Sequence, residues 1–225
     1  VGVAGVERPD PQPLQGPPHL AVGGDARGLL RRFPGSLTSV PVLHAAAAGH
    51  ALLSADPESG ILRRVPLAAA VGEAVMPTLA IEMLRLASHS PAFSIHRAGD
   101  AIRAVGVADR LVPTQPDASL WVHYGRLQPE RYVSASAVLA GTVPADRFKD
   151  RVVLVGVSGL GLVDFPVTAL RERVPGVEVH AQVIESIFDG TTLWRPSWAG
   201  LAELAVTLVA GLAVIPRANT WSREK

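Results

Sequence analysis

Three side chains near a glycine-rich loop have the residue types of a hydrolytic triad: Ser158, Asp164 and His180. A hydrolase holds its serine in a G-x-S-x-G turn between a strand and a helix, but Leu160 occupies the place of the last glycine. The sequence does not match a dinucleotide-binding loop either, because the glycines are wrongly spaced and residues 164–166 separate them from the helix that follows. The chain also has no cysteine nucleophile. We therefore predict no catalytic residues.

The same region offers a second kind of chemistry, the recognition of a ligand. Asp164 and Thr168 lie in a loop after a predicted strand, and Glu178 and His180 open the helix that follows. Ligands of α/β proteins bind at the carboxyl edge of the sheet, where these four side chains would meet. A structural role is the alternative: Asp164 would accept backbone N–H bonds, and Glu178 would suit the positive start of the helix.

A strand and a helix must position these side chains. Residues 152–155 (VVLV) have the composition and length of a strand buried on both faces, which predicts a central strand. After Pro175 and Gly176, helical spacing predicts an amphipathic helix that Gly190 ends. We expect its buried face to carry Val177, Ala181, Ile184, Ile187 and Phe188. We expect its solvent face to carry Glu178, Gln182, Glu185 and Asp189.

The rest of the chain alternates predicted strands and helices. Helices are predicted over residues 42–48, 77–88 and 134–141. Strands are predicted over residues 50–55, 61–71, 93–98, 101–107 and 120–124. This alternation predicts an α/β layered domain with a mixed β-sheet flanked by helices.

Composition excludes several classes of function. With 225 residues, of which 48% are hydrophobic and 18% charged, the chain can bury one sizeable core. Its net charge of +1 gives no basic surface for nucleic acid, and the lack of cysteine removes disulfides and thiolate metal sites. His44 and His50 are six residues apart, which is not a helical metal spacing. We expect neither a metal nor a cofactor.

The C-terminal segment differs in kind from the rest. Between residues 199 and 215 the only charge is Glu203, and Trp194 and Trp198 precede this stretch. About seventeen residues in a helix span roughly 26 Å, slightly less than the ~30 Å of a hydrocarbon core. The tryptophans suit an interfacial belt and Arg217 suits the cytoplasmic side, so we predict a transmembrane helix over residues 198–216. The alternative is a buried helix of a soluble core.

Two sets of motifs resemble one family. The first set is FKDRVVLVG at 148–156, GLVDFPVT at 161–168 and PGVEVHAQ at 175–182. The second is DPESGILRRVPL at 56–67 followed by MPTLA at 76–80. In this order and spacing they resemble the CHASE sensor family, second type, whose name stands for cyclases and histidine kinases associated sensory extracellular domain. The resemblance covers roughly residues 1 to 200.

This resemblance implies the extracytoplasmic sensory domain of a bacterial transmembrane signalling receptor. Residues 1–197 would be the sensor, residues 198–216 a membrane helix and residues 217–225 the start of a cytoplasmic loop. The effector would be a nucleotide cyclase such as an adenylate cyclase, a histidine kinase, a diguanylate cyclase or a serine/threonine kinase. The partners of the sensor would be an unknown extracytoplasmic ligand, membrane lipid, the receptor's own effector and a second copy of the chain in a homodimer.

The family normally has further strands, helices and a membrane helix before the position of Val1, so the resemblance also implies a sensor that lacks its N-terminal part. Two alternatives from other classes stay open. The first is a membrane-anchored extracytoplasmic serine hydrolase that uses Ser158, Asp164 and His180. The second is a purely structural anchoring module.

Overall fold

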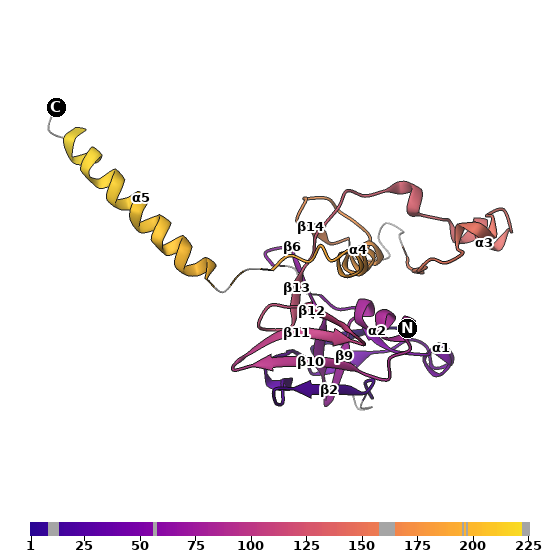
Figure 1. Ribbon diagram of the computed structural model, residues 1–225. Helices are drawn as coiled ribbons and strands as arrows, with labels where there is room; N and C mark the ends of the chain where they lie inside the picture. Colours follow the sequence, from indigo (N-terminus) through magenta and orange to yellow (C-terminus); the bar gives the residue numbers. More distant parts are fainter. Residues whose placement is uncertain (9–13, 56–57, 158–164, 195, 197, 222–225) are drawn as a thin grey trace. The chain divides into compact units, whose positions relative to one another are not determined.

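The computed structural model describes residues 1–225 except 9–13, 56–57, 158–164, 195, 197 and 222–225. The chain forms two compact units, Val1–Leu193 and Trp194–Lys225. The first unit contains all the strands of the described chain and its first four helices (Figure 1). The second contains one long helix, whose side chains are described as far as residue 212.

The largest sheet has four strands in the order β12-β11-β10-β2. Its members are β2 (His19–Val22), β10 (Phe93–Ala98), β11 (Ala101–Val107) and β12 (Arg110–Pro113). The bounds of β10 and β11 confirm the prediction. They form an antiparallel hairpin across Gly99, whose φ of +62° lies in the left-handed region that glycine adopts readily. β2 extends this sheet parallel to β10 (Figure 1).

Four smaller groups of strands complete the β-structure of the described residues. One sheet has the order β4-β1-β5 and comprises β1 (Gly2–Val6), β4 (Gly35–Leu37) and β5 (Ala51–Leu52). Another has the order β3-β8-β9 and comprises β3 (Arg31–Phe33), β8 (Ala68–Val71) and β9 (Ala74–Pro77). The two pairs are β7 (Arg64–Pro66) with β13 (Ser119–Trp121) and β6 (Ile61–Leu62) with β14 (Val167–Thr168).

The helices lie where local sequence signals place them. They are α1 (Pro41–Ala46), α2 (Leu79–Ala87), α3 (Ala135–Leu139), α4 (Gly176–Phe188) and α5 (Ala199–Trp221). α4 begins after Pro175 and ends before Gly190, whose φ is +66°. α2 contacts α4, and Ile81 and Val183 from these two helices are fully buried in the main core. That core also contains Phe93 and Val105 of the four-stranded sheet.

The mixed α/β class is confirmed and the largest sheet is mixed, but the strands form several separate sheets where the sequence predicts one. The predicted central strand at 152–155 is wrong, because these residues form no strand and pair with no strand of the described chain. Val153 is half exposed and Val155 is 93% exposed, whereas Leu154 packs against the core. An apolar run becomes a central strand only when neighbouring strands pair with its backbone on both sides.

α5 extends over 23 residues and exposes large apolar side chains such as Leu201, Val206 and Val209. Across the described part of the chain, no helix combines the length and the apolarity that crossing a membrane requires. The membrane helix predicted over residues 198–216 stays a prediction.

Candidate functional site

A line of buried polar side chains runs along α4. Glu178, Gln182 and Ser186 are each four residues apart, which places them on one face of the helix. They are 5%, 4% and 2% exposed, respectively. We call these three residues the polar ridge. Because a buried polar group without a hydrogen bond destabilises a fold, the partners of the ridge show what it does.

Both carboxylate oxygens of Glu178 have partners within the protein. The Tyr132 hydroxyl donates a 2.8 Å hydrogen bond to Oε2. Nε2 of Gln182 donates a 2.8 Å hydrogen bond to Oε1. Partial burial raises the pKa of Tyr132, and the hydrogen bond to Glu178 raises it further, which favours the protonated phenol that donates this bond. Glu178 therefore holds Tyr132 in place.

Gln182 binds the main chain of Gly125 through both ends of its amide. Oε1 of Gln182 accepts a 2.7 Å hydrogen bond from the Gly125 N–H, and Nε2 donates one of 3.3 Å to the Gly125 carbonyl. Ser186 continues the ridge by donating a 2.7 Å hydrogen bond to the Gln182 carbonyl. A side-chain amide that pairs with both backbone groups of one residue replaces a sheet partner for that residue.

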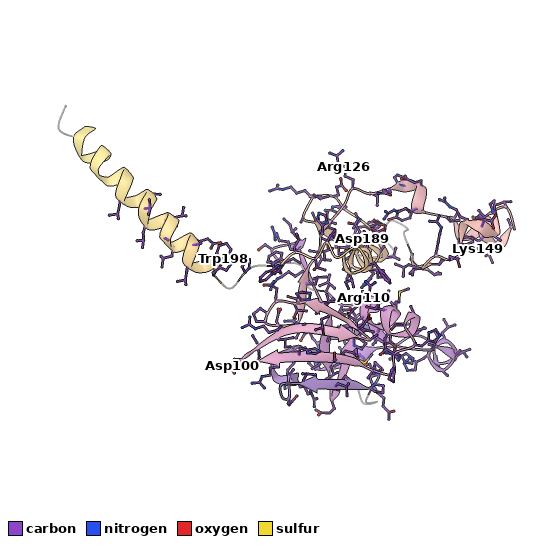
Figure 2. The ribbon with its side chains drawn as sticks, in the orientation of Figure 1. Asp100, Arg110, Arg126, Lys149, Asp189 and Trp198 are labelled. Carbon is purple, nitrogen blue, oxygen red and sulfur yellow. The ribbon has the colours of Figure 1, made fainter. Side chains whose placement is uncertain are left out.

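A fourth contact lies at the exposed margin of this face. Nη1 of Arg131 and Oε1 of Glu185 are 2.6 Å apart, and this hydrogen bond raises the pKa of the guanidinium. Gly125, Arg131 and Tyr132 all belong to residues 125–132, which we call the docking segment. Arg126 in this segment is exposed and points outward (Figure 2). α4 thus fixes a segment about fifty positions earlier in the chain.

His180 faces a different part of the fold from Glu178. Residues two positions apart on an α-helix point in directions that differ by about 200°, so the side chains of Glu178 and His180 lie on opposite sides of α4. His180 is buried and hydrogen bonds with the backbone of Leu53, just after β5. Burial lowers the pKa of the imidazole, and the hydrogen bond to Leu53 opposes this effect. The structure does not bring the two predicted site residues together.

Thr168 lies on β14 and is 2% exposed. Its Oγ1 is buried and has no hydrogen-bond partner among the described residues. Its amide donates to the carbonyl of Glu172, which closes a short turn ahead of α4. Asp164 and Ser158 fall outside the described residues, so the structure does not place the predicted ligand group or the hydrolase triad as a whole.

The predicted orientation of α4 is partly wrong. The sequence predicts Glu178 and Gln182 on the solvent face, but both are buried. It predicts Phe188 on the buried face, but Phe188 is 45% exposed. Ile184 and Ile187 are buried as predicted. The polar ridge is buried because it has partners in the docking segment, and no pattern within the helix itself reveals them. Sequence reasoning missed Tyr132 for the same reason.

The described residues hold no group of three or more His, Cys, Asp or Glu side chains that fit a metal ion. His44 and His50 do meet, with ring centroids 3.9 Å apart, and Nε2 of His50 lies 3.0 Å from the His44 carbonyl oxygen. Two imidazoles alone fall short of the three or four ligands of a zinc site.

Comparison with protein families finds a match to the CHASE2 domain over residues 12–215. The chain belongs to the CHASE2 family. CHASE2 domains are extracellular sensory domains of signalling receptors, which agrees with an extracytoplasmic placement. Comparison with curated proteins and with solved structures finds no match.

Proposed function

We propose that this CHASE2 domain is the extracytoplasmic sensory part of a bacterial transmembrane signalling receptor. The match over residues 12–215 supports this function most directly. In this proposal the domain itself is not catalytic. Its signal reaches a cytoplasmic effector, which we propose to be a nucleotide cyclase, a histidine kinase, a diguanylate cyclase or a serine/threonine kinase.

We propose α4 as the element that carries the signal. On one side α4 is fixed to the docking segment through Glu178 and Gln182, and on the other side His180 binds the backbone of Leu53. Residues 189–198 then connect α4 directly to α5. A helix held by two parts of a domain moves when either part moves, and small helix shifts are a common form of switching.

We also propose that residues 198–216 cross the membrane, with residues 217–225 on the cytoplasmic side. The support comes from the described part of α5, where Leu201, Val206 and Val209 are each more than half exposed. A helix that is apolar on all sides is stable when lipid or other protein covers it. Trp198, at its start, is 65% exposed and suits the membrane interface.

The topology can be tested in the full receptor in its bacterial host. Alkaline phosphatase, which is active only outside the cytoplasm, is expected to be active when fused after Gly190 and inactive when fused after Lys225. Green fluorescent protein is expected to give the opposite pattern, because it fluoresces when it folds in the cytoplasm. Phosphatase activity at both positions would contradict the membrane crossing, and activity at neither would contradict the extracytoplasmic sensor.

A further inference from the structure

The chain that leaves α4 pairs with β13 before it reaches α5. Leu193 forms an isolated antiparallel β-bridge with Trp121, the last residue of β13. Leu193 is also the last residue of the first unit, and α5 begins at Ala199. We call residues 191–193 the exit strap. Its bridge to Trp121 determines where the chain leaves the domain.

Trp121 lies between two partners. Arg64 of β7 is directly opposite it on one side, and Leu193 is opposite it on the other. Directly paired residues of antiparallel strands carry their side chains on the same face, so the three side chains form one row. Cζ of Arg64 is 5.4 Å from the centroid of the Trp121 ring, which is within the range of a cation–π contact.

Two carboxylates hold Arg64 beside the Trp121 ring. Nε of Arg64 donates a hydrogen bond to Oε1 of Glu58, and its Nη1 lies 3.6 Å from Oδ2 of Asp117. Asp117 is itself fixed, because its Oδ1 accepts a 2.6 Å hydrogen bond from the Ser119 hydroxyl and one of 3.1 Å from the Ser119 amide. Arg64 therefore acts as a positioning residue for Trp121.

The exit strap is held less firmly than the helix before it. Leu193 is 50% exposed, and the side chains of Arg64 and Asp117 are 34% and 51% exposed. Exposed ion pairs and cation–π contacts stabilise a fold only weakly. Ile184 and Ile187 of α4, in contrast, are buried in the main core. Because local opening follows low burial, the strap can separate from Trp121 while α4 stays folded.

Trp121 is also close in the chain to the segment that α4 holds. β13 continues through the buried residues Val122 and Tyr124 to Gly125, where the docking segment begins. Gln182 of α4 binds the backbone of Gly125 on both sides. A shift of the docking segment along α4 therefore reaches Trp121 through a short, buried stretch of chain.

We propose that the exit strap is a conformational switch, paired with Trp121 in one signalling state and released in the other. Gly190 is the hinge, because it has a φ of +66° and residues 189–191 are exposed. Arg64 favours the paired state by holding the Trp121 ring in place. The switching role rests on the proposed sensory function, whereas the pairing and its dependence on Arg64 do not.

Hydrogen exchange of the full chain tests the pairing. Arg64→Gln is expected to speed exchange in residues 119–122 and 191–193 about threefold or more, and to leave the buried residues of α4 unchanged. Arg103→Gln, an exposed control on β11, is expected to change neither region. Urea unfolding of both variants identifies any general loss of structure. Unchanged exchange of the strap in a folded Arg64→Gln variant would overturn the proposal.

A disulfide tests whether the strap moves. The chain has no cysteine, so the double variant Trp121→Cys/Leu193→Cys has one possible disulfide within these 225 residues. Paired residues of antiparallel strands have Cα atoms about 4.5–5.5 Å apart, a distance that a disulfide spans. We expect the bond to form under mild oxidation, as measured by the loss of reaction with a maleimide reagent. The oxidised form has a locked strap, and the reduced form has a loose one, because it lacks the Trp121 ring.

The two forms are then compared in the full receptor. Effector activity is expected to differ about threefold or more between them, with the wild type in between. Arg64→Gln is expected to shift the activity in the direction of the reduced form. The control His96→Cys/Ala104→Cys joins two paired residues of β10 and β11 and is expected to give equal activity in both forms. Equal activity of the locked and loose straps would overturn the switch.

Failure of the switch and failure of the sensory function give different results. If the disulfide does not form but the phosphatase fusions report an extracytoplasmic domain, the strap proposal alone is wrong. If the fusions place the domain in the cytoplasm, the sensory function is wrong and the switching role is wrong with it. The exchange of Arg64→Gln then still decides whether the strap is paired with Trp121.

Discussion

The Tyr132 hydroxyl donates a 2.8 Å hydrogen bond to Oε2 of Glu178, although the two residues are 46 positions apart in the chain. The segment between them contains α3 and the exposed residues 152–153, and this bond joins the two ends of that segment. Glu178 is in the first turn of α4, where a carboxylate is also favoured by the helix dipole. The bond therefore anchors both the start of α4 and the docking segment.

Tyr132→Phe is expected to lower the free energy of unfolding by about 1–2 kcal/mol, because the buried Oε2 of Glu178 loses its partner. Tyr124→Phe is the matched control. The Tyr124 hydroxyl is buried and has no hydrogen-bond partner among the described residues, so its removal is expected to be neutral or stabilising. Urea unfolding measures both variants. Equal losses in the two would contradict the anchoring role of Tyr132.

Gln182→Ala is expected to destabilise the domain by about 2–3 kcal/mol, since it removes the partners of the Gly125 backbone and of Oε1 of Glu178. Glu185→Ala removes only an ion pair that is almost half exposed, and we expect a loss below about 1 kcal/mol. Hydrogen exchange of the docking segment, compared between the two variants, locates the effect. Faster exchange spread evenly over the whole domain would show that Gln182 does not act at this segment.

The parts of the fold that follow from short-range signals were predictable from the sequence. Gly190 ends α4 where the sequence predicts, and Gly99 forms the turn between two strands with the predicted bounds. Each depends on glycine in a left-handed conformation, which neighbours in the chain determine. The family motifs also predicted the sensory family, because they are contiguous.

What depends on distant partners was not predictable. The burial of Gln182 requires the Gly125 backbone, which lies 57 positions earlier. Nothing in the helix itself distinguishes a buried amide with partners from a solvated one. Residues 152–155 likewise have the composition of a central strand, but strand pairing is set by segments elsewhere in the chain.

Val155→Lys tests the position of this apolar run. Because Val155 is 93% exposed, the substitution is expected to change the free energy of unfolding by no more than about 0.5 kcal/mol. Leu154→Ala is the contrasting variant, since Leu154 packs against the core, and its loss is expected to be at least about 1 kcal/mol. Urea midpoints measure both. A large loss in Val155→Lys would mean that this run is a buried strand after all.

The buried His180 is expected to make the free energy of unfolding depend on pH. Burial lowers the pKa of its imidazole below the ordinary value of about 6.5, so the unfolded chain binds a proton more readily than the folded domain does. The stability from neutral His180 is therefore fully present above about pH 6.5 and decreases as the pH falls below that value. His180→Gln keeps a hydrogen-bond donor near Leu53 and does not titrate.

We expect urea midpoints of the wild type to fall more steeply between about pH 7 and pH 5 than those of His180→Gln. The difference between the two curves isolates His180, because the carboxylates that titrate at lower pH are common to both proteins. Parallel curves would mean that His180 is equally accessible to protons in the folded and unfolded states. That result would contradict its burial against Leu53 and the placement of α4 that depends on it.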